Sequence, residues 1–262
     1  MPLLTATFIS YNEEADLPRA LASLKDIADE IIVVDSGSTD RTTEIAQSFG
    51  ARVFTRKLDS FAAQKNYATS LASHDWIFSM DCDEELSPEL RASMLTWKKT
   101  TPANEGYEIL HLTNYLGGWI RHSGWYPEYR LLLYRRGKGE FVSALHERVH
   151  LEGSPGRMKG HLFHYTIRSL AEHEAKLDAM TTLAAEDMFA RGYKFWRPAM
   201  VFAAPWTILQ RLLFQGGILD GRRGWLIAWY SAKYIYVKYR KLGQLLAGEQ
   251  LSRRSWPSPG GV

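Results

Sequence analysis

Short apolar runs alternate with longer amphipathic stretches over the first hundred residues of the chain. Each run has the length of a buried strand, and a helical pattern separates it from the next. This alternation predicts βαβ units and a parallel sheet. Asn12 or Asp16 would start the first helix and Asp40 the second. The four expected strands are Leu3–Ile9, Ile31–Val34, Ala51–Phe54 and Asp75–Met80.

The pattern changes after about residue 105, where shorter strand-like runs are joined by glycine-rich turns. We expect the sheet to become mixed there, with strands at Tyr107–Leu112, Tyr129–Tyr134, Arg148–Leu151 and His161–Tyr165. The rest of the chain has helical periodicity, over Ser169–Arg191, Pro198–Leu219 and Arg222–Leu246. The sequence thus predicts an α/β catalytic domain at 1–167, an amphipathic helical region at 168–247 and a disordered tail at 248–262.

The composition of the chain limits where in the cell the protein is expected to lie. With 262 residues and 45% hydrophobic content, the chain is long enough to bury a full core. The single cysteine, Cys82, excludes an internal disulfide and a thiolate zinc cage. The first residues lack a signal-peptide pattern, and no run reaches the roughly 18 apolar residues of a spanning helix. We therefore expect a cytoplasmic protein.

Two carboxylates follow the fourth apolar run, in the D-x-D sequence Asp81-Cys82-Asp83. On a strand end, Asp81 and Asp83 would project to one side, where their oxygens could grip one hard cation that a diphosphate shares. The alternative is a solvated acidic turn before the helix near Ser87.

A third carboxylate, Asp35, follows the second apolar run and begins a Ser/Gly loop. Asp35 could accept a hydrogen bond from a base or a ribose hydroxyl, while Gly37 lets the backbone turn closely. Asp35 could also be an ordinary turn residue.

Three motifs occur in register: Ser10-Tyr11-Asn12-Glu13-Glu14, Val33-Val34-Asp35-Ser36-Gly37-Ser38-Thr39-Asp40 and Asp81-Cys82-Asp83-Glu84. Through them the chain resembles inverting glycosyltransferases of family two, which have the GT-A fold. Within that family it is most similar to enzymes that add a hexose to the inner core of bacterial lipopolysaccharide. The resemblance covers about residues 3 to 166.

The resemblance implies a role for each matching residue. Tyr11 and Glu13 would line a uridine pocket, and Asp35 would contact the nucleoside. Asp81 and Asp83 would hold the nucleotide with Mg²⁺ or Mn²⁺. Lys65 matches a basic residue near the donor, although a solvated helix lysine is the alternative. His164 matches a late histidine that binds the metal or a phosphate, and imidazole suits Mn²⁺ better than Mg²⁺.

An inverting transfer also needs a general base, because the acceptor hydroxyl loses its proton as it attacks the sugar. Glu147, in Ala144-Leu145-His146-Glu147, is our candidate for that base. An ion pair with Arg148 or Arg130 is the alternative role for Glu147.

An aromatic segment with paired glycines lies between these motifs. Trp119, Trp125 and Tyr126 could form a lid over the acceptor, or a small satellite core. Arg130 and Arg135 are both candidate partners for diphosphate or acceptor oxygens.

The carboxyl-terminal helices differ in charge from the rest of the chain. Residues 191 to 241 contain ten basic residues, twelve aromatic residues and one acidic residue, Asp220. Cationic, aromatic helices suit the surface of an anionic membrane. The same composition would also suit a homo-oligomer interface or helices packed on the sheet. Nucleic acid is disfavoured as a partner, because no reading module is present.

The sequence therefore predicts a metal-dependent glycosyltransferase that moves a hexose, most simply glucose, from a UDP-sugar to a lipopolysaccharide-core or other glycolipid acceptor. It would lie peripherally on the inner face of the cytoplasmic membrane. An enzyme that glycosylates polyisoprenyl phosphate is the first alternative. A non-enzymatic membrane scaffold that binds sugar nucleotides is the second.

Overall fold

The computed structural model describes residues 1–142, 148–194 and 197–251. These residues form two compact units. Among the described residues, the first unit consists of Met1–Leu112 and Glu128–His164, and the second consists of Thr113–Pro127 and residues 165–251.

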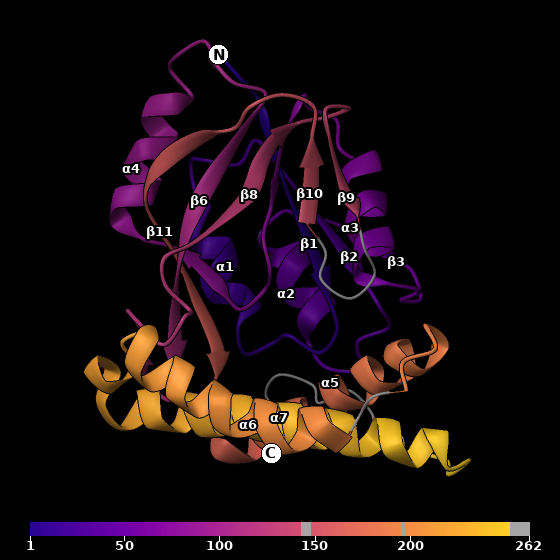
Figure 1. Ribbon diagram of the computed structural model, residues 1–262. Coiled ribbons are helices and arrows are strands. Elements are labelled where there is room, and N and C mark those ends of the chain that lie inside the picture. Colours follow the sequence, from indigo (N-terminus) through magenta and orange to yellow (C-terminus); the bar gives the residue numbers. More distant parts are fainter. Residues whose placement is uncertain (143–147, 195–196, 252–262) are drawn as a thin grey trace. The chain divides into compact units, whose positions relative to one another are not determined.

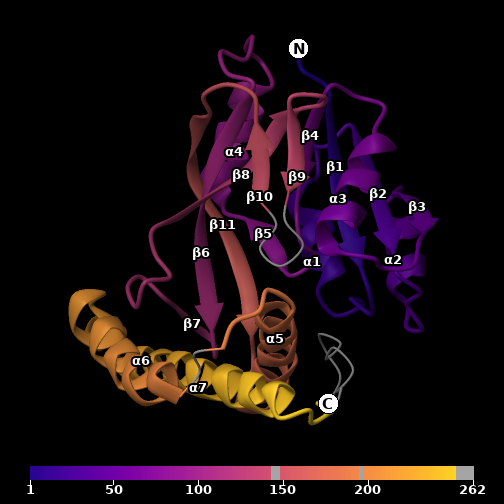
Figure 2. The ribbon, with the colours of Figure 1, turned by 45° about the vertical axis from the view of Figure 1, so that its right-hand side comes forward.

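The first unit begins with four parallel strands in the order β3-β2-β1-β4 (Figures 1 and 2). The expected strands and their parallel arrangement are confirmed. Parallel strands bring their carboxyl ends to one edge of the sheet, where α/β proteins bind ligands. The strands are β1 (Leu4–Ser10), β2 (Glu30–Asp35), β3 (Arg52–Thr55) and β4 (Trp76–Ser79).

The sheet continues beyond β4 in the order β8-β6-β11-β5, with β8 antiparallel to β4. The expected mixed sheet is thus confirmed. Three short strands were not predicted, because two to four residues are too few to show an apolar pattern. They are β5 (Glu84–Leu86), β7 (Gly118–Trp119) and β9 (Gly139–Val142). The predicted strands are β6 (Gly106–Tyr115), β8 (Glu128–Arg135), β10 (Arg148–Leu151) and β11 (Gly156–Ile167).

Helices cover the two faces of the parallel strands (Figure 2). Side chains alternate along each strand, so that Val33 and Phe78 pack on one face while Ile32 and Ile77 pack on the other. The first face carries α1 (Leu17–Ser23), α2 (Thr42–Ser48) and α4 (Pro88–Trp97), and the second carries α3 (Phe61–Ser70).

The helix starts differ in detail from the prediction. Asp16 occupies the N-cap position of α1, although its side chain makes no capping hydrogen bond. The N-cap of α2 is Arg41 rather than Asp40, whose carboxylate accepts a hydrogen bond from the Thr42 backbone N–H at 3.0 Å.

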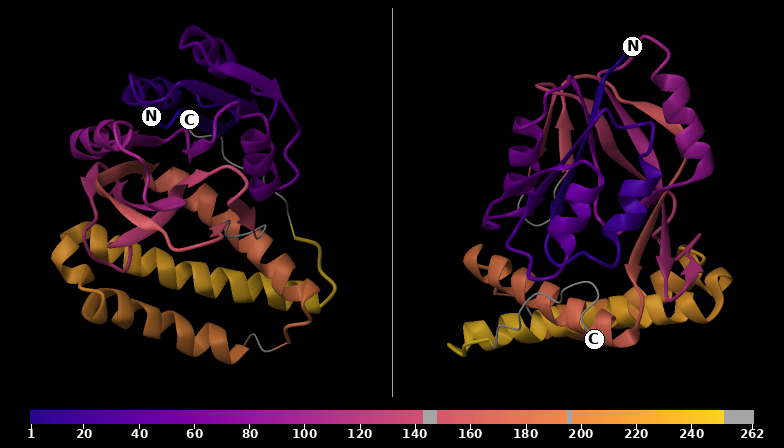
Figure 3. Two further views of the ribbon diagram at one scale, coloured as in Figure 1. Left: turned by 90° about the horizontal axis from the view of Figure 1, so that it is seen from above. Right: turned by 180° about the vertical axis from the view of Figure 1, so that it is seen from behind.

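The second unit is mainly helical, with α5 (Leu170–Ala190), α6 (Arg197–Leu209) and α7 (Gly221–Leu246). The single helix expected over 198–219 is wrong. Helix α6 ends at Leu209, and a π-helical turn η1 (Gln210–Phe214) and a 3₁₀ turn η2 (Gly217–Asp220) follow. Gly216 lies between these turns with a φ of 65°, which interrupts a right-handed helix. Helices α6 and α7 lie side by side (Figure 3).

The predicted class, an α/β mixed sheet flanked by helices and followed by a helical extension, is confirmed. Within the described ranges, no helix combines the length and the apolar character needed to cross a bilayer.

Candidate active site

Asp35 ends β2 at the carboxyl edge of the sheet and is almost completely buried. One carboxylate oxygen accepts hydrogen bonds from the hydroxyls of Ser10 and Ser38. The other accepts from the backbone N–H groups of Gly37 and Ser38 at 2.9 and 2.8 Å. Asp35 therefore fixes the shape of the loop that follows β2, and a nucleoside contact through this carboxylate remains a prediction.

The loop after β1 is joined to the loop after β2 by further hydrogen bonds. The Asn12 N–H donates to Ser38 Oγ and the Glu13 N–H donates to Thr42 Oγ1, at 2.8 and 2.7 Å. Tyr11, between β1 and these contacts, is 42% exposed. An aromatic ring that is accessible beside two ordered loops is suited to stacking on a planar base.

The two D-x-D carboxylates lie in a turn and not on a strand end, because β4 ends at Ser79 and the Glu84 N–H donates to the Asp81 carbonyl. The middle residue points inward as expected, since the Cys82 thiol donates to the carbonyl of Ile9 on β1. This bond ties the turn to the strand next to β2. The Asp81–Asp83 turn and the Asp35 loop thus follow β4 and β2, the two strands that flank β1.

Each D-x-D carboxylate is paired with a basic side chain. Lys65 Nζ on α3 lies 2.9 Å from Asp81 Oδ1, and His164 Nε2 on β11 lies 3.3 Å from Asp83 Oδ2. Burial favours neutral Asp81, but the Lys65 ammonium outweighs it and lowers the Asp81 pKa to about 2. Burial likewise disfavours charged His164, but Asp83 and neighbouring carboxylates raise its pKa to about 9. Without a cation, therefore, Asp81 is ionised and His164 is protonated at neutral pH.

Glu84 and His111 complete this cluster. Glu84, His164 and His111 come from β5, β11 and β6, three adjacent strands, and their ligand atoms lie within 4.8 Å of one another. Burial first, and then the Asp81 carboxylate, raise the pKa of Glu84 to about 8, while burial lowers the pKa of His111. Neither ring nitrogen of His111 has a hydrogen-bond partner among the described residues.

These oxygen and nitrogen atoms fit a divalent cation. A buried imidazole that has no hydrogen-bond partner can bind such a cation through a ring nitrogen. The sequence interpretation missed Glu84 and His111. The sequence did contain a signal for His111. In the strand Gly106–Tyr115 it lies on the same buried face as Ile109 and Thr113, where an apolar residue would be expected.

A cavity of about 490 Å³ opens beside the cluster. This volume is within the range of small-molecule sites. Among the predicted residues, Lys65 and Asp81 line the cavity, together with Glu84 and Arg130. Tyr11, Glu13, Asp35, Asp83 and His164 do not belong to its lining.

The carboxylates, the paired bases and the cavity therefore lie at the edge where the sheet would hold a ligand. The model of the family described as glycosyl transferase family 2 matches residues 7–142, which contain β1 to β9. The chain belongs to glycosyl transferase family 2.

Relatives of this family-2 chain extend over nearly its full length. The lipopolysaccharide core biosynthesis glycosyltransferase LpsC of Rhizobium meliloti is 31% identical over 92% of this chain and 92% of its own. An uncharacterized glycosyltransferase of Rickettsia typhi is 26% identical over 94% of this chain and 88% of its own. Glucosyl-3-phosphoglycerate synthase of Mycobacterium tuberculosis, solved with Mn²⁺ and UDP, has 23% identity and a TM-score of 0.36 over 45% of each chain.

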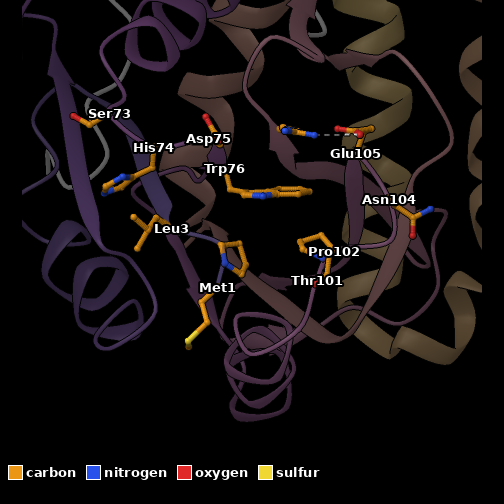
Figure 4. A pocket seen from close by; sticks show the side chains of 12 residues that line it. Met1, Leu3, Ser73, His74, Asp75, Trp76, Thr101, Pro102, Asn104 and Glu105 are labelled. Atoms are coloured by element: carbon orange, nitrogen blue, oxygen red, sulfur yellow. Dashed lines mark ion pairs between the residues drawn. The ribbon is translucent and has the colours of Figure 1, made fainter.

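Two arginines that the sequence left as alternatives differ in position. Arg130 lines the cavity beside Asp81, and the carboxylate of Glu128 raises its pKa despite its burial. Arg135 lies at the other end of β8, where it pairs with Glu105 at 3.5 Å in a second pocket (Figure 4). Arg130 is therefore the one of the two arginines that lies at the candidate site.

Two further sequence predictions have different outcomes. The proposed base Glu147 lies outside the described residues. Trp125 packs with Tyr115 and Ile227 in a small core, at 5.5 Å between the two aromatic rings, as in the satellite-core alternative to a lid.

Proposed function

We propose that this family-2 glycosyltransferase moves a hexose, glucose in our interpretation, from a UDP-sugar to a hydroxyl of a lipopolysaccharide-core or other glycolipid acceptor, with inversion. The observation that carries the proposal is the partly buried Asp81–Lys65 and Asp83–His164 cluster beside a cavity of about 490 Å³. Such a concentration of perturbed, paired groups is typical of catalytic sites. The similarity to LpsC supports the acceptor class.

A divalent cation, Mg²⁺ or Mn²⁺, is expected at Asp81, Asp83 and His164, whose oxygen and nitrogen atoms suit it. When bound, the cation would neutralise charge that develops on the departing diphosphate. Lys65 and Arg130 would add positive charge on the side of the cavity that they line.

The nucleoside would lie against Tyr11, Glu13 and Asp35. Asp35 already accepts four hydrogen bonds from its own loop and from Ser10, so we assign it the role of holding that loop in shape for the nucleoside. Tyr11 would stack on the base with its exposed ring.

Glu147 is proposed as the general base that takes the proton of the acceptor hydroxyl as the oxygen attacks the anomeric carbon. The sugar–diphosphate bond breaks on the opposite side, which inverts the configuration. Arg148, the next residue in the chain, lines the cavity. Its position supports, but does not test, the role of its neighbour.

The acceptor class and the cationic, aromatic helices together support a location on the inner face of the cytoplasmic membrane. We therefore propose a peripheral enzyme that receives its donor from the cytoplasm and its acceptor from the lipid.

The proposal is tested by screening UDP-hexoses with truncated lipopolysaccharide, with and without Mn²⁺, and by measuring UDP release and acceptor mass. Glu147→Gln should nearly abolish transfer, and the matched change Glu140→Gln, at an exposed position of β9, should not. If Glu147→Gln loses little activity, the base assignment is wrong.

The same screen separates the alternative of transfer to polyisoprenyl phosphate. A phosphate oxygen is already ionised and needs no base, so that activity would survive Glu147→Gln. Product formed on polyisoprenyl phosphate and not on truncated lipopolysaccharide would favour the alternative.

A further inference from the structure

Ten large apolar side chains of the second unit are exposed between residues 202 and 236, on consecutive elements from α6 to α7. Phe202, Leu219 and Phe214 are the most exposed, at 73%, 73% and 72%. We call this set the apolar face. Its members are Phe202, Trp206, Leu209, Leu213, Phe214, Ile218, Leu219, Trp225, Trp229 and Tyr236.

The spacing of seven of these residues places them in one stripe along each helix, and Phe214, Ile218 and Leu219 lie in the turns that join the helices. Residues 202, 206, 209 and 213 follow the i, i+4, i+7, i+11 repeat across α6 and η1, and residues 225, 229 and 236 follow it in α7. Because α6 and α7 lie side by side (Figures 1 and 3), the two stripes belong to neighbouring helices.

The apolar face is separate from the packed side of the helices. Ile227, Ala228 and Tyr230 of α7 are buried, and Tyr230 and Lys233 bond Glu174 of α5. Helix α7 therefore has an apolar inner side that is covered and an apolar outer side that is not. A helix that is apolar on both sides indicates a second environment besides the protein core.

The charges around the apolar face are positive. Asp220 is the single acidic residue between residues 197 and 246. Its side chain is 4% exposed and accepts hydrogen bonds from the backbone N–H groups of Arg121 and His122 and from the Ser123 hydroxyl. Arg222 and Arg240 are exposed. The surface thus combines uncovered tryptophans and aliphatic side chains with positive charge and no exposed described carboxylate from 197 to 246.

We propose that the apolar face inserts into the headgroup region of an anionic bilayer, with α6 and α7 lying in the plane of the membrane. Tryptophan and tyrosine are favoured at that depth, and arginines beside them attract anionic headgroups. A second copy of the chain is a poorer occupant, because a two-fold interface would bring the same positive residues together. The proposal gives the peripheral location a defined contact surface, and its test needs no glycosyl transfer.

The test is co-sedimentation of the full chain with vesicles of phosphatidylcholine alone and of phosphatidylcholine mixed with phosphatidylglycerol. The triple variant Phe202→Ser, Phe214→Ser and Leu219→Ser should bind anionic vesicles at least tenfold more weakly. The matched control, Leu3→Ser, Phe49→Ser and Leu58→Ser, removes exposed apolar side chains from the first unit and should bind like the parent. Circular dichroism during heating checks that both variants fold.

Loss of binding in the first variant alone, with a preference for anionic vesicles in the parent, supports the proposal. Equal binding by both variants overturns it, as does a parent chain that binds neither vesicle. A parent that sediments as a dimer without vesicle binding, and becomes monomeric in the first variant, assigns the face to self-association instead. UDP-sugar hydrolysis without a lipid acceptor is measured in parallel, so a failure here is distinguishable from a failure of the proposed enzyme activity.

Discussion

Two cavities of nearly equal volume, about 490 and 450 Å³, lie at opposite edges of the parallel strands in the first unit. At the carboxyl edge, the side chains of Lys65 and Glu84 are 8% and 2% exposed. At the amino edge (Figure 4), those of Asp75 and Arg135 are 73% and 50% exposed. Volume therefore does not distinguish the two cavities.

The two edges differ in how their charged side chains are stabilised. Exposed charges are solvated by water, and their ion pairs contribute little. Charges that are held at low exposure must be stabilised by one another, which shifts their pKa values. Weakly exposed charged groups with shifted pKa values lie at the carboxyl edge, where they can interact with a bound ligand.

The largest expected effect contrasts one aspartate from each edge. Asp83→Asn should lower kcat about a thousandfold, because it removes a proposed cation ligand and the partner of His164. Asp75→Asn, at the amino edge, should leave kcat within about twofold. UDP release with a saturating acceptor measures both. Comparable losses in the two variants would remove the functional distinction between the edges.

A smaller effect is expected when a basic side chain is replaced at each of the two edges. Lys65→Met keeps the length of the side chain but leaves Asp81 without its ammonium partner at 2.9 Å. We expect kcat/KM to fall about tenfold to a hundredfold and stability to fall by about 1–2 kcal/mol, less than for a fully buried pair, because the side chain of Asp81 is partly solvated.

Arg135→Met is the matched control for Lys65→Met. Its pair with Glu105 is half exposed, so activity and stability should change little. Urea unfolding and initial rates provide both readouts. A stronger effect of Arg135→Met than of Lys65→Met would contradict the comparison.

The parallel half of the sheet could be predicted because each of its strands is marked by a few consecutive residues in the sequence. Each strand has a short, mostly apolar run, and the carboxylates Asp35 and Asp81 follow two of these runs directly. Tyr11, Glu13 and Asp83 could be identified for the same reason, because each belongs to a short motif of consecutive residues.

The meeting of Glu84, His111 and His164 could not be predicted in the same way. It depends on the order β6-β11-β5, which brings together strands far apart in the chain, and β5 is only three residues long. Register decides which side chains share a face, and no short window of sequence contains that information.

His111→Phe tests whether the nonlocal cluster serves a cation. Because neither ring nitrogen of His111 has a hydrogen-bond partner among the described residues, and Nδ1 approaches Glu84 Oε1 only to 3.6 Å, a ring without polar atoms should stabilise the cation-free protein by about 1 kcal/mol. The rise in melting temperature caused by Mn²⁺ should become smaller. His150→Phe, at an exposed position of β10, is the control and should change neither value. Destabilisation of the cation-free protein by His111→Phe would contradict this interpretation.

The smallest effect on activity belongs to the amino edge, where the expected change concerns stability alone. Glu30, at the start of β2, accepts hydrogen bonds from the Thr5 hydroxyl, the Ser73 backbone N–H and the Arg52 guanidinium. Burial favours its neutral form, but these donors outweigh burial and lower its pKa to about 2. Since this pKa lies below the unfolded value of about 4.3, the ionised group stabilises the fold above that pH, and the contribution disappears as pH falls towards 2.

Glu30→Gln should therefore cost about 1–2 kcal/mol at pH 7, and the difference from the parent should shrink steadily below about pH 4.5. The exposed change Glu44→Gln on α2 should have no such pH-dependent cost. Urea unfolding across this pH range measures the difference, and kcat at pH 7 should be unaffected in both variants because neither residue lines the cavity beside Asp81. A fall in kcat without a fall in stability for Glu30→Gln would mean that the amino edge also serves catalysis, and the contrast between the two cavities would then have to be abandoned.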